Sequence, residues 1–235
     1  MKTRQHLIPR ERVGLILLDV DHNGEYLTFQ FLFNGPETYA QVKEQIEQKN
    51  LEKPTMAQTA SLVHAIFDSD GRYFNEVKDK LNTNWLWAFT GVLHIPEEGV
   101  YIQDDPETRY GLPFMKKSKL VRILEQETNK KVKTVRFVPF GYKDGEQTLR
   151  ELEKNPYIVG LAGEDGAEKL AIVAGKFKFD PCLSSFNSGD KPEIKVSCLR
   201  SLFDSSPRLY IDEIYLGFNR DGFALGIQQK KPIQK

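Results

Sequence analysis

A short segment near the start of the chain holds the residues whose types and spacing come closest to chemistry: Asp19, Asp21, Asn23 and Gly24. Carboxylate and amide oxygens at alternating positions can bind a hard cation such as Ca²⁺ or Mg²⁺. Asn-Gly between two apolar runs is also the strongest short-range signal for a β-hairpin. Because β-forming residues fill 13–20 and 26–33, we favour the hairpin and expect the Asn-Gly pair to fix its register.

Two families with metal-dependent sites share part of this spacing. It resembles the first six positions of an EF-hand calcium loop, but Gln30 stands at the twelfth position, where that family has a bidentate Glu. It also resembles the first motif of haloacid-dehalogenase-type phosphatases, in which a buried strand delivers an Asp nucleophile and an Asp acid/base. That resemblance gives these roles to Asp19 and Asp21. It covers only this segment, and no succession of parallel βαβ units follows.

The metal-binding hypothesis draws further ligands from a second acidic segment. Asp104 and Asp105 follow the apolar run 100–102, and they could hold magnesium beside the first segment. The predicted metal ligands are Asp19, Asp21, Asn23, Asp104 and Asp105. This alternative predicts a magnesium-dependent phosphohydrolase or phosphodiesterase, with Mg²⁺ or Ca²⁺ bound; otherwise we expect no cofactor.

Charge is distributed unevenly along a chain whose formal net charge is zero. Eight Lys and Arg against two Glu give residues 116–136 a net charge of +6, and five acids without a base give residues 97–107 a net charge of −5. The basic strip could bind a protein or the phosphates of a nucleic acid. Alternatively, the two runs pair with each other as solvated faces. The predicted binding residues are Lys116, Lys117, Lys119, Arg122, Lys131, Lys133 and Arg136, with Lys130 in the same strip.

Several other residues suited to chemistry lack the partners that chemistry needs. Gly160, Gly163 and Gly166 precede a predicted helix, but Glu164 and Asp165 inside the series would repel phosphate. His64 and His94 have no partner at metal-ligand spacing, so we expect core or boundary imidazoles. Four aromatic residues could line a pocket or stack bases, but core packing is the expected role of Trp85, Trp87, Phe89 and Tyr101. We expect Cys182 and Cys198 to be reduced core thiols.

The apolar pattern predicts a single α+β domain over 1–235, with a mostly antiparallel sheet built from hairpins, several covering helices and a possible loop or linker near 180–192. The 40% apolar and 28% charged composition argues against disorder. The expected helices are 36–48, 55–67, 72–81, 116–127, 146–153 and one from about 166. The expected later strands are 85–95 in the centre, 100–102, 132–142 at an edge, 194–199, 209–218 and 223–228, the last two forming a hairpin.

These observations favour one class of function without naming a ligand. Neither a signal peptide nor a run of about 20 apolar residues is visible, so we expect a cytoplasmic protein without a membrane span. No complete catalytic motif is present. The sequence therefore predicts a non-catalytic binding or assembly protein that engages a macromolecule, with the phosphohydrolase or phosphodiesterase as the alternative.

Overall fold

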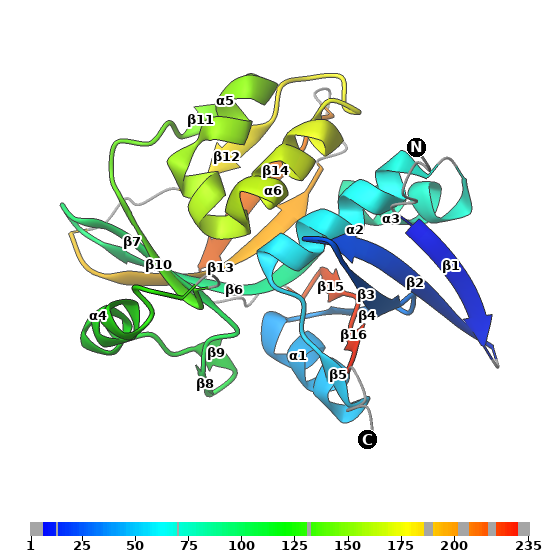
Figure 1. Ribbon diagram of the computed structural model, residues 1–235, viewed down its shortest axis with the longest axis horizontal. Helices are drawn as coiled ribbons and strands as arrows, with labels where there is room; N and C mark the ends of the chain where they lie inside the picture. Colours follow the sequence, from blue (N-terminus) through cyan, green and yellow to red (C-terminus); the bar gives the residue numbers. More distant parts are fainter. Residues whose placement is uncertain are drawn as a thin grey trace.

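The computed structural model describes residues 7–12, 14–69, 71–130, 133–185, 190–201, 207–215 and 220–229. Helices and mostly antiparallel strands alternate along this part of the chain, which confirms the predicted α+β class. Two sheets dominate, and helices cover the larger sheet on both faces (Figure 1). The helices are α1 (Tyr39–Gln48), α2 (Met56–Asp68), α3 (Arg72–Thr83), α4 (Lys117–Gln126), α5 (Leu149–Lys154) and α6 (Pro156–Ala174).

The first sheet is antiparallel and has the strand order β1-β2-β3-β16-β5. Its strands are β1 (Leu7–Arg12), β2 (Leu15–His22), β3 (Glu25–Gln30), β16 (Ile227–Gln228) and β5 (Leu51–Glu52). Asn23 (φ 52°) and Gly24 (φ 86°) form the two-residue loop between β2 and β3. Positive φ at both positions is the mark of the type I′ turn that Asn-Gly favours. The predicted hairpin and its register are confirmed.

The second sheet has the order β10-β7-β6-β13-β14-β12-β11, and β15 connects β6 to β4 at its side. Its strands are β10 (Val135–Pro139), β7 (Gly99–Asp104), β6 (Trp85–Ile95), β13 (Glu193–Arg200), β14 (Tyr210–Tyr215), β12 (Cys182–Ser184), β11 (Gly145–Glu146), β15 (Gly222–Ala224) and β4 (Asn34–Glu37). As predicted, β6 lies inside the sheet and β10 at its edge, where Pro139 removes no ladder hydrogen bond. Apart from these sheets, β8 (Thr108–Arg109) and β9 (Leu112–Pro113) form a small hairpin.

The predicted terminal hairpin of 209–218 and 223–228 is wrong. β14 pairs with β13 and β12, whereas β15 pairs with β4 and β6, and β16 belongs to the other sheet. The last apolar run is buried on both faces, with Phe223 and Ala224 at most 1% exposed. An apolar run buries more side-chain surface between two layers of the fold than as one strand of a hairpin with a solvent-exposed face.

Helix α6 begins ten residues earlier than predicted, at Pro156 instead of near Gly166. Asn155 caps it by accepting a hydrogen bond from the amide of Tyr157, and Pro156 suits the first turn. The glycines serve close packing: a Cβ on Gly160 would lie 2.5 Å from Val138 Cγ2. Only Gly163 (φ 76°) interrupts the helical conformation, and this break exposes backbone in the middle of α6.

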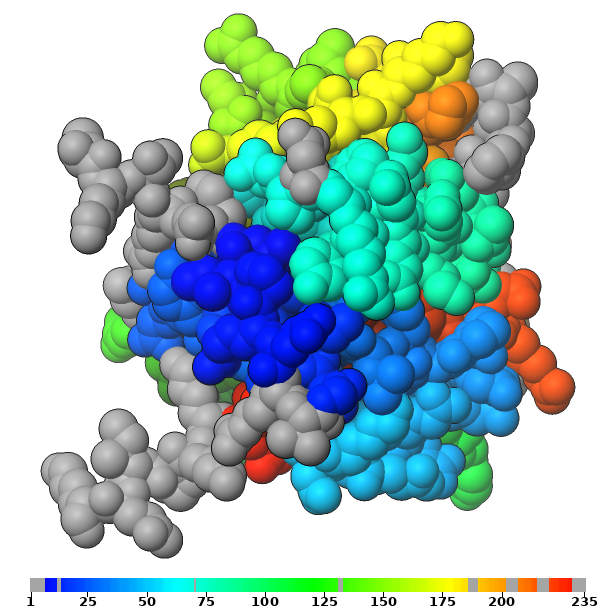
Figure 2. Space-filling model, turned by 90° about the vertical axis from the view of Figure 1, so that its right-hand side faces the viewer, coloured from blue at the N-terminus to red at the C-terminus, as the bar shows by residue number. Residues whose placement is uncertain are grey.

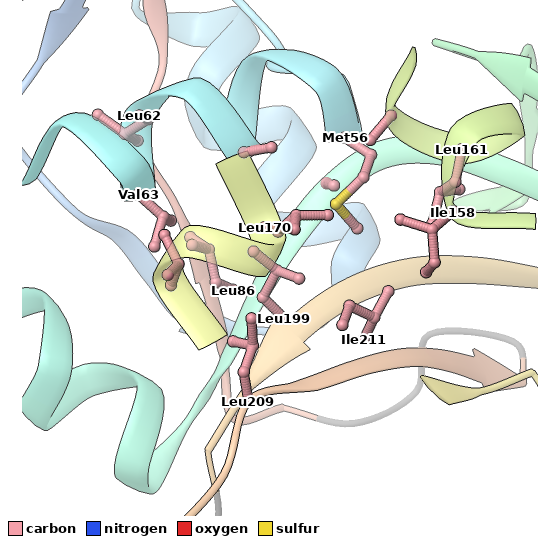
Figure 3. Close-up of a cluster of buried hydrophobic side chains, with 14 of the residues drawn as sticks. Met56, Leu62, Val63, Leu86, Ile158, Leu161, Leu170, Leu199, Leu209 and Ile211 are labelled. Carbon is pink, nitrogen blue, oxygen red and sulfur yellow. The ribbon is translucent and has the colours of Figure 1, made fainter. Parts of the chain in front are cut away.

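The main core lies between α2, α6 and strands of both sheets (Figure 3). Met56 and Val63 from α2 meet Ile158 and Leu170 from α6 over β-strand residues such as Leu199. Viewed from the side of β1, the dark-blue first strands lie beside the turquoise region of α2 and α3, with yellow α6 beyond it (Figure 2). Smaller clusters lie on the other face of β6, under α1 and under α4.

The expected loop near 180–192 contains β12, which pairs with β11 and β14; its residues 186–189 lie outside the described part of the chain. Cys182 and Cys198 are free thiols on strands that flank β14. Within the described residues, no helix combines the length and the apolar character needed to cross a membrane.

Candidate functional site

The two aspartates of the first acidic segment stabilise the sheet. They alternate along β2 with the buried Leu18 and Val20, so they lie on the opposite face of the strand. Asp19 Oδ1 accepts hydrogen bonds from Arg10 Nη2 at 2.5 Å and from Thr28 Oγ1 at 2.6 Å on the neighbouring strands. Asp21 Oδ1 accepts one from the amide of Gly24 at 3.1 Å, which holds the turn.

The second acidic segment has other partners. Asp104 is bound by the guanidinium of Arg136 through both carboxylate oxygens and accepts a hydrogen bond from Thr90 Oγ1 at 2.8 Å. Asp105 lies 3.3 Å from Lys53 Nζ. Across the described residues, no group of three or more His, Cys, Asp or Glu side chains is arranged to hold a metal ion. Of the predicted metal ligands, Asp19, Asp104 and Asp105 bind cations of the protein itself. Asp21 accepts from a backbone amide, and the Asn23 side chain lies 3.2 Å from Nε2 of His22.

A cavity of about 720 Å³ brings four of the predicted residues together: Asn23, Asp104, Lys133 and Arg136. Its walls are the tip of the β2–β3 hairpin, the start of α2, the end of β7, the start of β10 and the break in α6. Arg136 also donates from Nε to the carbonyl of Gly160 at 2.7 Å and from Nη1 to that of Lys133 at 3.0 Å. Most of its five N–H groups are therefore engaged, so Arg136 fixes the cavity wall.

A polar network lies beside this cavity, with His22 and Asp165 in the cavity lining and Ser61 and Lys169 buried behind them. Ser61 Oγ on α2 lies 2.9 Å from His22 Nδ1 and 3.0 Å from Lys169 Nζ on α6. Lys169 Nζ also donates to Asp165 Oδ2 at 2.6 Å. The network connects the hairpin tip to both helices. Because Ser61 is 1% exposed, no ligand in the cavity can reach its hydroxyl in this structure.

The pKa of His22 is lowered, first by burial and then by the nearby ammonium of Lys169, while Asp165, Asp21 and Glu25 oppose the shift. The unfolded chain therefore binds a proton on His22 more readily than the folded one, so stability is lost as pH falls through about 6.5. We expect His22→Gln to remove this part of the pH dependence. Urea denaturation at about pH 7.5 and about pH 5.5 measures it; an unchanged difference between the two pH values in the variant would contradict the assignment.

Residues of the basic strip form ion pairs with residues of the acidic run 97–107. This pairing was one of the two alternatives predicted for the strip. Lys117 Nζ lies 2.5 Å from Glu98, and Lys119 Nζ lies 2.6 Å from Glu107. Arg136 binds Asp104 of the acidic run, whereas Lys130 Nζ lies 3.2 Å from Glu127 within the basic strip itself. Lys131 lies outside the described residues. Lys116, Arg122 and Lys133 are exposed, with no carboxylate at ion-pair distance in the part of the chain that the structure describes.

The β8–β9 hairpin adds residues that sequence reasoning missed. The Arg109 guanidinium lies 3.6 Å from the centre of the Phe114 ring, and Lys116 Nζ lies 5.3 Å from the same ring. Tyr110, at the tip, is fully exposed. Together with the first turns of α4 these residues form what we call the α4–hairpin surface: Arg109, Tyr110, Phe114, Lys116, Lys117, Lys119 and Arg122. The sequence signal was weak, a Tyr-Gly pair between two very short strands.

The aromatic residues of β6 and β7 belong to the core, as predicted. Trp87 and Phe89 are 0% exposed, and Tyr101 is 6% exposed. The rim residue Trp85 is covered by the Arg200 guanidinium, 3.9 Å from its ring. These rings therefore offer no stacking platform, whereas Tyr110 is the most exposed of the large hydrophobic side chains in the described part of the chain.

Comparison of the chain with protein-family models, with curated proteins and with solved structures finds no match. A function for this chain must therefore be inferred from its own sequence and geometry.

Proposed function

We propose that the protein is a non-catalytic binding protein that engages a nucleic acid through the α4–hairpin surface. The observation that carries the proposal is the arrangement around the β8–β9 hairpin. Of the five cations of the surface, Arg109 and Lys116 lie over the Phe114 ring, next along the chain to the exposed Tyr110 turn, and Lys119 reaches Glu107 beside the same hairpin. Phosphates are bound chiefly by Lys and Arg, and aromatic faces between the cations suit the bases. We propose the cytoplasm as its location, where thiols such as Cys182 and Cys198 stay reduced.

Two of the five cations are paired, but these pairs are weak competitors for a phosphate. The side chains of Lys117 and Glu98 are each 43% exposed, and those of Lys119 and Glu107 are 49% and 59% exposed. Exposed ion pairs contribute about 0.2–1 kcal/mol and are screened by salt. Counting both glutamates, the surface keeps a net charge of +3.

The cavity is a poorer candidate for a phosphate group. Glu164 and Asp165 lie in its wall, and the Arg136 charge is already compensated by Asp104. Lys133 is the remaining cation among its described lining residues, and Glu164 offsets it. The two ends of the basic strip thus differ in charge. The cavity at its C-terminal end holds compensated charges, whereas the α4–hairpin surface at its N-terminal end carries excess positive charge.

Salt-dependent binding tests the proposal. Neutralising Lys116, Lys117, Lys119 and Arg122 to Gln is expected to weaken binding of a labelled oligonucleotide and to reduce the slope of log K against log[salt] by up to about 3. The matched control neutralises one Arg and three Lys that are exposed elsewhere: Arg150, Lys154, Lys176 and Lys191. We expect the control to keep most of the slope. Equal affinities and slopes for the two variants would reject the α4–hairpin surface as the binding site.

A further inference from the structure

We infer that the bound nucleic acid is single-stranded and that Tyr110 stacks on one of its bases; this inference rests on the proposed function. A tyrosine ring can stack on any base whose face is open, whereas a continuous duplex keeps these faces inside its own stack. Three features of Tyr110 support this inference: its backbone conformation, the anchoring of its turn and its surroundings.

Tyr110 occupies a position where another residue type would fit better. It has φ 53°, Gly111 has φ 79°, and Arg109 pairs with Leu112 across this two-residue turn. Type I′ turns favour Asn or Asp followed by Gly, because a larger side chain is strained at positive φ. Since the Tyr110 side chain is fully exposed, packing does not offset this strain. Strain at an exposed ring is typical of a functional position.

The turn is held firmly against the body of the protein. Lys43 Nζ on α1 donates to Thr108 Oγ1 at 2.9 Å, and the amide of Phe114 donates to the carbonyl of Glu107 at 2.7 Å. A Cβ on Gly111 would lie 2.7 Å from the Ala40 Cβ, so the turn lies directly on α1. A ring on an anchored turn loses little conformational freedom when it binds, which favours affinity.

The surroundings of Tyr110 favour a nucleic acid over an apolar pocket of another protein. Arg109 precedes it, and the Arg109 guanidinium shares the Phe114 ring with Lys116. Protein-binding hot spots have apolar neighbours that exclude water, whereas the Tyr110 side chain is fully exposed and directly follows the cation Arg109 in the chain. Positive charge around a stacking ring complements bases and phosphates together.

Fluorescence anisotropy with labelled oligonucleotides tests the inference on the full chain. The probes are single-stranded DNA and single-stranded RNA of about 20 nucleotides, longer than the roughly 4–16 that such a site covers, and the DNA duplex of the same sequence. The variants are Tyr110→Ala, Tyr110→Trp, Tyr110→Asn and, as a matched control with another exposed tyrosine, Tyr26→Ala. The DNA and RNA arms distinguish the two sources of single strands.

We expect Tyr110→Ala and Tyr110→Asn to weaken single-strand binding about 5-fold to 100-fold, while duplex binding and the salt slope stay unchanged. Tyr110→Trp and Tyr26→Ala are expected to bind as the unaltered protein does. Tyr110→Asn is also expected to raise the melting temperature, because Asn suits the turn. Undiminished single-strand binding by Tyr110→Ala overturns the inference and leaves the proposed function standing. Absence of oligonucleotide binding by the unaltered protein at low salt overturns both.

Discussion

Replacing Glu213 with Ala is expected to lower the free energy of unfolding by about 3–5 kcal/mol. The Glu213 side chain is 1% exposed; its Oε2 lies 2.5 Å from Nε2 of the fully buried His94, and Tyr157 OH donates to its other oxygen. Removing the carboxyl group leaves two buried polar groups without their acceptor and creates a cavity. Urea denaturation, followed by far-UV circular dichroism, measures the loss.

The control for this prediction is Glu213→Gln. Burial raises the pKa of Glu213, while the hydrogen bond and the charge of His94 oppose the shift. Gln has nearly the shape of Glu and still accepts one hydrogen bond through its amide oxygen, so it should be clearly less destabilising than Ala. Equal losses for Gln and Ala, or a loss below about 1 kcal/mol for Ala, would show that this buried pair does not stabilise the sheet as described.

Gly222→Ala is expected to cost about 3 kcal/mol of folding free energy, at the upper end of what overpacking produces. A Cβ on Gly222 would lie 1.8 Å from Nε1 and 2.1 Å from Cε2 of Trp87. Trp87 is fully buried, its Nε1 donates to the carbonyl of Glu37 at 3.3 Å, and Tyr39 packs edge-on against its ring. Neither the indole nor β15, which is paired with β4 and β6, can move away easily.

Trp87→Phe provides the matching test of this close contact. The clash involves atoms of the five-membered ring, which Phe lacks, so the double variant should be more stable than the sum of the two single losses predicts. Strict additivity, or a Gly222→Ala variant as stable as the unaltered protein, would be inconsistent with the described packing of β15 on β6. Denaturant midpoints and slopes of all three variants give the comparison.

Local sequence signals predicted the parts of the fold that depend on neighbouring residues. Asn23-Gly24 specified a tight turn with both φ angles positive, and Thr55 was suited to cap the helix that follows it, as its side chain does at the start of α2. The strand of alternating aromatic residues was predicted to be central, because apolar residues on both faces exclude a half-exposed strand. These predictions needed no knowledge of distant segments.

The errors arose where distant packing decides the structure. Gly160 and Gly166 indicated a loop, but both lie inside α6. At Gly160 the Val138 side chain approaches too closely for a Cβ, whereas at Gly166 the helix packs on Ala57 and Ala60 of α2. The last apolar run could form a local hairpin or pair with β4 and β6, as it does. The sequence does not show that this run packs against Trp87, which is the contact that accompanies the second pairing. Propensity rules do not contain such long-range contacts.

In the candidate site, too, local sequence signals predicted some features and missed those that depend on contacts between distant residues. Charge counts identified the basic strip and raised the possibility that the acidic run pairs with it, but they could not assign partners such as Lys117 to Glu98. They also gave no weight to Tyr110, because an isolated aromatic residue is unremarkable until its exposure and backbone angle are known. The function proposed for this surface therefore comes from cations of α4 that the sequence identified and from three hairpin residues that only the structure revealed: Arg109, Tyr110 and Phe114.

The most direct test of the central claim is amide hydrogen exchange, measured by mass spectrometry with and without a single-stranded oligonucleotide. If the α4–hairpin surface binds the oligonucleotide, the amides in peptides that cover 107–123 should exchange more slowly in the bound sample. These peptides contain the β8–β9 hairpin and the first turns of α4. Peptides from β2, β3 and α5 should exchange at the same rate in both samples. Protection confined to those other elements, or no protection at saturating oligonucleotide, would contradict the account.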